Sequence, residues 1–361
     1  PLSVPTRAAY SQGIKLADEF IRRHLQDNGD WPSGVIVDLW GSATMRTAGE
    51  EFAMALHLLG VKPTWAEGSE RVSGFEILPL ITLDRPRIDV TLRVSGLFRD
   101  VFPTLSTLYQ QAIDAVSHRE ESADWNPYKS GVENVRIYGP APGSYGLGMG
   151  SAPEQFSDEG RKAAAEAWLE ASSYAINGER IYQDKKGLKD IVSAADSFVH
   201  LQDMLETDLL LSADYAAHEA GFAAAKASIG GKVSLYHLDN SDPEKPASRT
   251  LTEEIARVVY ARACNPKWLA GMKRHGFRGA AEISATLSHM AAFANLADVV
   301  GSHLFDSYHD ATIGNDDIVK FMSENNPEAL ASMRDCFKQL YNSGLWKTRR
   351  NFILGDLEIS A

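Results

Sequence analysis

The first 150 residues alternate short runs typical of strands with longer runs typical of helices, and this alternation restricts the possible fold more than any other feature. Residues 35–40 (VIVDLW) form an apolar, β-branched run between Gly34 and Gly41, which indicates a buried strand. Residues 47–59 then carry apolar side chains at helical spacing and stop before a glycine. Further elements are predicted as strands at 75–80, 88–94 and 132–138, and as a helix at 99–116. Such alternation is typical of an α/β fold, with a mostly parallel sheet flanked by helices.

Strand signals become rare after residue 150. Residues 158–175 and 190–211 are long amphipathic stretches, and a capping box (TLTE) opens a helix at Thr250. Asn265, followed by proline, caps the next helix. More helix is predicted at 278–297 and 327–341, with one strand-like run at 233–238. The sequence therefore predicts two domains, an α/β, Rossmann-like domain over 1–150 and a mainly α-helical domain over 151–361.

Charge and cysteine content exclude several classes of protein. The 361 residues carry 36 Lys and Arg against 48 Asp and Glu, a formal net charge of −12, so we expect neither nucleic acid nor an anionic membrane as a partner. Two cysteines without CxxC spacing exclude a disulfide framework and a zinc ribbon, and they suit a reducing cytoplasm. No apolar run approaches the ~18 residues of a membrane span. Because the first residue is Pro1 and not Met, we expect a piece of a longer protein.

Three of the predicted strands or their loops lead into segments rich in glycine and serine, at 40–44 (WGSAT), 95–100 (SGLFRD) and 143–146 (GSYG). In open α/β sheets, ligands bind beyond the carboxyl ends of the strands, so these segments are the expected rim of a binding site. Plain turn chemistry is the alternative, because glycine and serine are common in tight strand–helix turns. No segment matches a phosphate-binding loop or a dinucleotide fingerprint, so we expect this chain not to bind ATP.

Several titratable side chains are candidates for catalysis or metal binding. Asp214 and His218 are four residues apart, so on a helix they would share a face and the carboxylate could orient the imidazole. His200 would share a helical face with Asp196 and Asp203 in the same way, and a further histidine ends a predicted helix at 275. Each histidine could instead be a satisfied surface or capping residue. Three arginines could pair with carboxylates of a ligand or simply be solvated: Arg85, Arg87 and Arg99.

Two long stretches go beyond composition and spacing, RPRIDVTLRVSGLFRD at 85–100 and NPKWLAGMKRHGFRGAAEI at 265–283. Both resemble the large subunits of the cobaltochelatase (CobN) and magnesium chelatase family. The similarity continues in order through DLWGSATMRTAGEE (38–51), RIYGPAPGSYG (136–146), DYAAHEAGF (214–222) and RTLTEEIARVVYARACNPKW (249–268), so it covers nearly the whole chain. The segments at 214–222, 235–246 and 303–306 resemble the cobalt enzyme more than the magnesium enzyme.

The resemblance implies the C-terminal part of the macrocycle-binding subunit of an ATP-dependent cobaltochelatase of cobalamin biosynthesis. This subunit would insert Co²⁺, as substrate, into hydrogenobyrinic acid a,c-diamide. An AAA+ ATPase subunit and an adaptor subunit would use the ATP and Mg²⁺, and the complex would be cytoplasmic. Because the family's chain is several times longer, we expect this piece alone to be inactive.

Metal insertion requires a base for the ring N–H protons and groups that strip water from the metal. We hypothesise that His218, with Asp214 and Glu219 beside it, is the base or a transient ligand of the metal, the tentative metal ligands being His218 and Glu219. His275 is the second candidate for the base. The groups expected to hold the macrocycle are the polar and aromatic side chains of the strand-end segments: Trp40, Ser95, Arg99, Asp100, Ser144 and Tyr145.

Three rival interpretations remain open at the level of sequence. The chain could insert Mg²⁺ into protoporphyrin IX, as the magnesium relatives of the resemblance would. It could be a non-catalytic domain on which the ATPase subunits dock, in which case the histidines are incidental. It could also be a free-standing α/β ligand-binding protein, which the family resemblance and the start at Pro1 disfavour.

Overall fold

The computed structural model describes residues 3–129 and 134–357 and divides into two compact units. Unit 1 comprises residues 1–148, 167–205 and 229–250, and unit 2 comprises residues 149–166, 206–228 and 251–361. Each unit is therefore built from several stretches of the chain, whereas the sequence predicted one boundary near residue 150. The difference arises because strands between residues 174 and 250 return to the sheet of unit 1.

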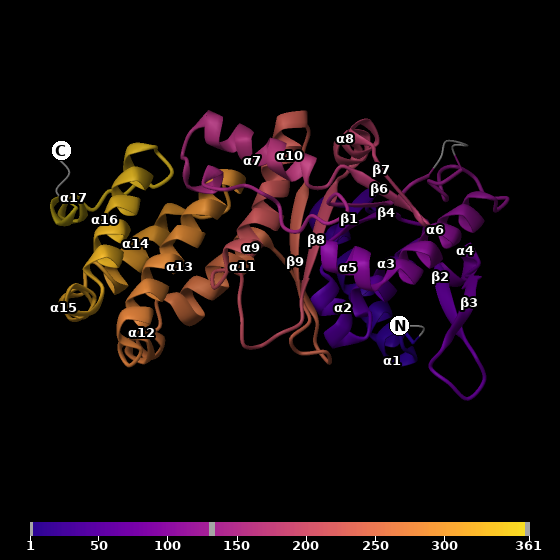
Figure 1. The fold of residues 1–361 in the computed structure, drawn as a ribbon, viewed down its shortest axis with the longest axis horizontal. Coiled ribbons are helices and arrows are strands. Elements are labelled where there is room, and N and C mark those ends of the chain that lie inside the picture. The colour runs from indigo at the N-terminus through magenta and orange to yellow at the C-terminus, as the bar shows by residue number, and fades with distance from the viewer. Residues whose placement is uncertain (1–2, 130–133, 358–361) are drawn as a thin grey trace. The chain divides into compact units, whose positions relative to one another are not determined.

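Unit 1 is built on a mixed eight-stranded sheet, in the order β10-β9-β8-β1-β4-β5-β6-β7 (Figure 1). The five strands from β9 to β5 are parallel, and the outer strands β10, β6 and β7 run antiparallel to their neighbours. The strands are β1 (Gly34–Leu39), β4 (Asp89–Val94), β5 (Ile137–Gly139), β6 (Tyr174–Asn177), β7 (Arg180–Gln183), β8 (Ser197–Gln202), β9 (Ser234–Asp239) and β10 (Ala247–Thr250). The predicted α/β class with a mostly parallel sheet is confirmed.

One face of this sheet carries the main core. Alternating side chains of β1 and β4, such as Val37 and Leu92, pack against three amphipathic helices of unit 1. These are α1 (Arg7–Asn28), α3 (Glu50–Leu59) and α6 (Pro103–Ser117). Helices α1 and α3 approach closely at Gly13, where a Cβ atom would lie 2.7 Å from the Cβ of Ala53. Helix α1 was not predicted from the sequence, although Thr6 caps its start and Gly29, at φ 75°, ends it.

Smaller elements join the strands of unit 1. Helix α2 (Gly41–Thr47) follows β1, and α5 (Gly96–Val101) follows β4. The predicted helix at 47–59 is therefore α3 alone apart from its first residues, whereas the predicted helix at 99–116 comprises the end of α5 and α6. The run at 75–80 lies partly in β3 (Val72–Ile77), which pairs only with β2 (Val61–Trp65) in a separate two-stranded sheet. Strand 132–138 was predicted partly over residues outside the described part of the chain, and its described portion ends in β5. The remaining helices are α4 (Leu80–Leu83) and α8 (Lys185–Ala194).

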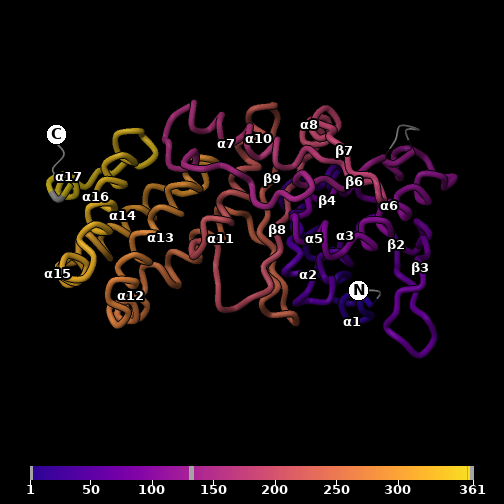
Figure 2. The backbone as a smooth tube through the Cα atoms, in the orientation of Figure 1, coloured from indigo at the N-terminus to yellow at the C-terminus, as the bar shows by residue number. Residues whose placement is uncertain are grey.

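Residues 190–211 were expected to form one long amphipathic stretch, and this prediction is wrong at the centre, which forms β8. All six residues of β8 are buried, because this strand lies between β9 and β1 and is covered on both faces. A strand covered on both faces shows no alternation of apolar and polar residues, so periodicity does not distinguish it from a buried helix. Figure 2 shows the result, since strands of very different colour, and so of distant sequence position, lie side by side in one sheet.

Unit 2 is helical, as predicted. Its longest helix, α13 (Gly276–Ala297), packs against α12 (Pro266–Lys273), α15 (Asp316–Asn325) and α16 (Pro327–Asn342). The other elements are α7 (Asp158–Glu170, which continues into unit 1), α9 (Ala213–Tyr215), α10 (Gly221–Ile229), α11 (Leu251–Val258), α14 (Ser302–Ala311) and α17 (Asn351–Asp356). Two π-helical turns, η2 (Ala216–Ala220) and η3 (Val259–Ala263), interrupt the α-helices. Among the described residues, no helix is long and apolar enough to cross a membrane.

Candidate functional site

The predicted strand-end segments of unit 1 meet at the carboxyl edge of the sheet. The hydroxyl of Ser95 accepts hydrogen bonds from the backbone N–H of Phe98 at 3.1 Å and of Gly41 at 3.0 Å, so it caps α5 and ties α2 to it. A Cβ atom at Gly96 would lie 2.6 Å from the ring of Tyr145, so the loop after β5 packs directly on the start of α5. The structure therefore brings the segments at 40–44, 95–100 and 143–146 together.

Arg99 anchors the loop that follows β5. Its guanidinium is buried and donates to both carboxylate oxygens of Asp100, at 2.7 and 3.0 Å, and to three backbone carbonyls, those of Pro140, Ala141 and Ser144. Tyr145 donates its phenolic hydrogen to the same carboxylate of Asp100. The hydrogen bond from Arg99 is the main reason that the pKa of Asp100 lies below its ordinary value. We expected Arg99 to face a ligand, and the structure instead shows its hydrogen bonds holding the loop.

Exposed apolar side chains surround this edge. Met45 of α2, Leu97 of α5 and Tyr145 are 53%, 37% and 65% exposed, and Leu205, after β8, is 77% exposed. Asp203, two residues before Leu205, forms a two-bond ion pair with Arg46 of α2, at 2.8 and 2.9 Å, so this segment is tied to the same edge. We name Met45, Leu97, Tyr145 and Leu205 the carboxyl-edge rim. Large apolar side chains exposed together in this way are typical of ligand or partner surfaces.

A row of buried titratable side chains crosses the five parallel strands. In the register of the strands, His200 of β8 lies opposite Asp38 of β1 and opposite His237 of β9. Asp38 lies opposite Arg93 of β4. Arg93 in turn lies opposite Tyr138 of β5. All five side chains are at most 3% exposed. We name this row the polar rung. Buried polar groups are costly unless they hydrogen-bond, so a row of five is a marked departure from an apolar sheet face.

Asp38 and His200 form a hydrogen-bonded pair at the centre of the polar rung. Nδ1 of His200 lies 3.0 Å from Oδ2 of Asp38, and the indole N–H of Trp40 donates to the same oxygen at 2.8 Å. The ring of Trp40 also meets the imidazole edge-on, with centroids 4.8 Å apart. An ionised carboxylate only accepts hydrogen bonds, so beside a charged Asp38 the proton sits on Nδ1 and Nε2 is left as the basic nitrogen. Burial lowers the pKa of Arg93, and the nearby Asp38 opposes that shift.

This pair was not predicted from the sequence, because the spacing of His200 to Asp196 and Asp203 was interpreted as that of a helix face. In the structure His200 lies on β8, while Asp196 accepts hydrogen bonds from Ser33 and Asp203 pairs with Arg46. One signal was available in the sequence. Three largely apolar runs, VIVDLW, SFVHLQ and SLYHLD, each carry Asp or His at the fourth position. Matching positions of this kind become neighbours when the strands are adjacent and parallel.

The second predicted group, Asp214, His218 and Glu219, lies in unit 2. His218 and Glu219 are buried in the π-helical turn η2, a rare element that is common at functional sites. The hydroxyl of Ser212 donates to the carboxylate of Asp214 at 3.4 Å and accepts from the backbone N–H of Asp214 at 3.2 Å, so the pairing of Asp214 with His218 that their spacing suggested is not observed among the described residues. The polar rung and the carboxyl-edge rim both belong to unit 1. Among the described residues, no three His, Cys, Asp or Glu side chains gather closely enough to hold a metal ion.

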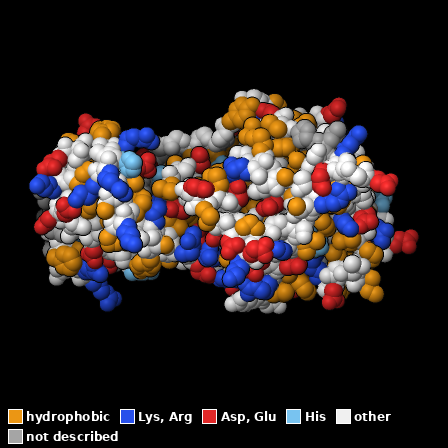
Figure 3. All heavy atoms as spheres, turned by 90° about the horizontal axis from the view of Figure 1, so that it is seen from below, with side chains coloured by type: hydrophobic (Ala, Val, Ile, Leu, Met, Phe, Trp, Pro, Cys, Tyr) orange, Lys and Arg blue, Asp and Glu red, His pale blue; other side chains and the backbone are white. Residues whose placement is uncertain are grey.

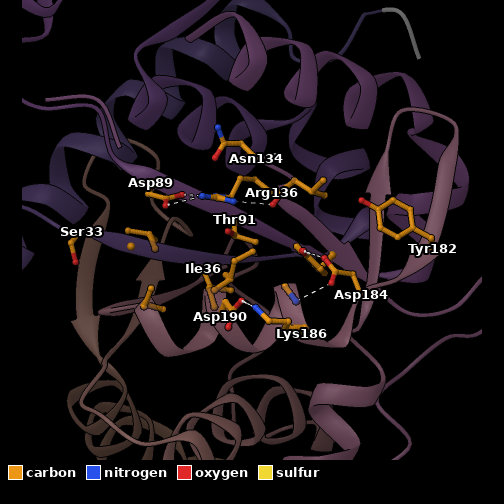
Figure 4. A pocket seen from close by; sticks show the side chains of 18 residues that line it. Ser33, Ile36, Asp89, Thr91, Asn134, Arg136, Tyr182, Asp184, Lys186 and Asp190 are labelled. Carbon is orange, nitrogen blue, oxygen red and sulfur yellow. Dashed lines mark hydrogen bonds and ion pairs between the residues drawn. The ribbon is translucent and has the colours of Figure 1, made fainter. Parts of the chain in front are cut away.

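His275 is exposed at the start of α13 and lines a cavity of about 500 Å³ between α12 and α13. A second cavity, of about 430 Å³, lies in unit 1 between α8 and the beginnings of β1, β4 and β5 (Figure 4). Its charged side chains largely pair with one another, as Arg136 does with Asp89 and Lys186 with Asp190. This cavity was not predicted, because it lies toward the amino ends of the strands, away from the carboxyl-edge rim.

Comparison with known proteins relates this arrangement to one family. The family model described as CobN/Magnesium Chelatase matches residues 1–353. The aerobic cobaltochelatase subunit CobN of Sinorhizobium sp. is 41% identical over 97% of this chain. The magnesium-chelatase subunit ChlH of Oryza sativa subsp. japonica is 25% identical over 96% of it. The solved catalytic subunit of cobaltochelatase from Mycobacterium tuberculosis superposes with a TM-score of 0.94 and 31% identity, over 99% of this chain.

The chain spans 29% of the length of the Sinorhizobium subunit, 26% of the rice subunit and 32% of the solved mycobacterial chain. The whole length of the present sequence, with its strand-end segments and its helical unit, therefore corresponds to a part of these longer subunits. Because the family model and the cobaltochelatase relatives match nearly every residue, the chain belongs to the CobN/Magnesium Chelatase family.

Proposed function

We propose that this chain is the C-terminal part of the macrocycle-binding subunit of a cobaltochelatase, which inserts Co²⁺ into hydrogenobyrinic acid a,c-diamide. The relative named as a cobaltochelatase subunit is 41% identical, and the relative named as a magnesium-chelatase subunit is 25% identical, which favours cobalt. Insertion of Mg²⁺ into protoporphyrin IX is the alternative. The observation that carries the proposal is the buried pair of Asp38 and His200 beneath the strand ends that bear the carboxyl-edge rim.

The chemistry of metal insertion suits such a site. Four ring nitrogens replace the water around the metal while the ring N–H protons leave, so the reaction needs a proton acceptor in a site that excludes water. In our proposal Nε2 of His200 accepts a proton, and Asp38 stabilises the resulting imidazolium. The apolar rim contacts the face of the macrocycle. Ser144, Ser95 and Trp40 lie near its periphery, and Arg99 acts as a positioning residue by fixing the loop that carries Tyr145.

Unit 2 contributes a second set of candidates in this proposal. His218 and Glu219 are buried side by side in η2, so they could act as a proton acceptor or as transient ligands of the incoming Co²⁺. His275 is exposed, so the surrounding water gives it a high-dielectric environment. For this reason we favour His218 over His275 as the proton acceptor of unit 2. An AAA+ ATPase subunit and an adaptor subunit would supply ATP hydrolysis with Mg²⁺ in the cytoplasm, because no phosphate-binding motif occurs in this chain.

The experiment that tests ring binding is an absorbance titration of the purified protein with hydrogenobyrinic acid a,c-diamide. Tyr145→Ala should weaken binding about three- to tenfold, the loss of one aromatic contact. Ile81→Ala is the matched control, because Ile81 is 90% exposed on α4, away from the rim. Equal weakening by both variants, or by neither, would argue against the rim as the ring site. Parallel titration with protoporphyrin IX separates the cobalt and magnesium alternatives.

A further inference from the structure

A basic region in unit 2 stands out in a protein that is acidic as a whole. Residues 255–281 contain no Asp or Glu and six Lys or Arg, although the chain has a net charge of −12. This region forms the end of α11, η3, α12 and the first turns of α13. Figure 3, which views the molecule from below, shows several Lys and Arg side chains on the part of unit 2 where α12 lies. Such a local reversal of charge favours a partner of opposite sign.

The charges of this region divide into two groups. Three are neutralised within the protein, since Arg257 pairs with Glu254, Arg262 with Asp208 and Lys273 with Asp317. The others are exposed, and within residues 3–129 and 134–357 no carboxylate pairs with them: Lys267, Arg274 and Arg278. Internal acids were available to neighbouring cations but not to these three. Their charges are therefore free to meet carboxylates from another molecule.

An apolar cavity lies beside Arg278, and its lining residues Trp268 and His275 are the sequence neighbours of Lys267 and Arg274. It has a volume of about 500 Å³ and is lined by Leu211, Trp268 and Met272, with His275, Arg278 and Glu282 at its polar side. The guanidinium of Arg262, held by Asp208, lies 4.6 Å over the ring of Trp268, so the indole wall of the cavity is fixed. A fixed apolar wall beside free cations suits a ligand that presents an apolar group flanked by acids.

We propose that this surface, defined by Lys267, Arg274 and Arg278 around the α12–α13 cavity, binds an acidic segment of a partner protein. One apolar side chain of the segment enters the cavity, and its neighbouring carboxylates meet the free cations. The length of the surface favours a peptide over a small acid. Lys267 lies at the start of α12 and Arg274 just past its end, seven residues later, so the rise of the helix separates them by about 10 Å. An extended peptide covers that distance with about three residues.

This inference goes beyond the proposed function and does not depend on it, because it concerns a surface of unit 2 and not the site on unit 1. The test is fluorescence anisotropy of the 361-residue protein with a short fluorescein-labelled peptide of Glu and Asp residues that has one central leucine. We expect saturable binding that weakens as salt is added, since the contacts are charged. Replacing the leucine of the peptide by alanine should weaken binding several-fold, and a peptide with Lys in place of the acids should not bind.

Protein variants decide whether the proposed surface is responsible. Arg274→Ala with Arg278→Ala should weaken peptide binding at least tenfold. Lys162→Ala is the matched control, an exposed lysine of α7 beside Arg161, which contacts Asn295 near the far end of α13. Melting curves establish that all variants are folded. The proposal would be overturned if the wild-type protein showed no saturable binding, or if Lys162→Ala weakened binding as much as the double variant does. It would also be overturned if the alanine peptide bound as tightly as the leucine peptide. Tighter binding of single-stranded RNA, or displacement of the peptide by millimolar propionate, would overturn it as well.

Discussion

The guanidinium of Arg87 and the carboxylate of Glu121 form a two-bond ion pair, with both N···O distances 2.8 Å, across 34 residues of sequence. Arg87 is fully buried and also donates to the backbone carbonyls of Leu59, Gly60 and Leu78. Arg85, two residues earlier, donates to the carbonyls of His57 and Leu58. The two arginines of the RPR motif therefore satisfy the free carbonyls at the end of α3, where a helix favours cations. Neither serves the solvated or ligand-binding role that we had considered for them.

Arg87→Ala should lower the free energy of unfolding by about 3–5 kcal/mol, because it leaves Glu121 and several carbonyls without their donor. The pKa of Glu121 is lowered chiefly by its hydrogen bond from Arg87. A lowered pKa means that this stabilisation is present above the ordinary pKa of glutamate and is lost as pH falls through the folded-state value. Urea denaturation at several pH values measures both effects. A loss below 1 kcal/mol at neutral pH would contradict this account.

Glu51 should have the opposite pH dependence. It is fully buried at the start of α3, and its Oε2 atom has no hydrogen-bond partner among the described residues. Burial, and then the charge of Asp203, raise its pKa to about 8. A raised carboxyl pKa means that stability is greatest while the group is protonated and falls as pH rises from about 4.5 to 8. Glu51→Gln should remove a loss of stability on the order of 5 kcal/mol across this range. Unfolding curves with the same slope against pH in both proteins would refute the assignment.

The anchoring of the β5 loop by Arg99 can be tested separately from catalysis. Arg99→Ala removes five hydrogen bonds, so it should lower the free energy of unfolding by about 2–4 kcal/mol and speed proteolysis within residues 140–148. Arg22→Ala is the control, because Arg22 is more than half exposed and pairs with Glu19 on the surface of α1. Limited proteolysis with mass spectrometry locates the cleavage. If Arg99→Ala and the wild-type protein were cleaved in this loop at the same rate, Arg99 would not be what anchors the loop.

The polar rung predicts a catalytic defect without loss of the macrocycle. In the assembled chelatase, His200→Ala should slow metal insertion by ~10²–10⁴-fold, the range for a lost general base. Asp38→Asn should slow insertion less and shift its pH profile, because it changes only the partner of the imidazole. Ring binding, followed by absorbance, should be retained by both variants. The same assay on His218→Ala compares the two units. Wild-type turnover with His200→Ala and a large loss with His218→Ala would assign the base to unit 2.

Local sequence predicted the elements that have a period or a cap. The runs at 35–40 and 88–94 became β1 and β4, the helix capped by Asn265 became α12, and the helix at 278–297 became α13. Residues 214, 218 and 219 lie in helical turns, which their spacing had only assumed, and no residue type specifies the π-helical turn there. Asp38 and His200 could not be paired from local pattern, since 162 residues separate them and only the strand order makes them neighbours. Burial of Arg99 was equally invisible, because it depends on carbonyls supplied by a loop 41 residues later.

The interrupted chain path of unit 1 has a consequence for how this protein is made. Strand β1 is bonded on one side to β4, at residues 89–94, but on the other side to β8, at 197–202, which in turn needs β9, at 234–239. During synthesis, about 160 further residues must leave the ribosome before β1 loses its open edge, and an open apolar edge invites pairing with other chains. Fragments that end near residue 150 should therefore aggregate, and useful truncations should end after β10, at residue 250.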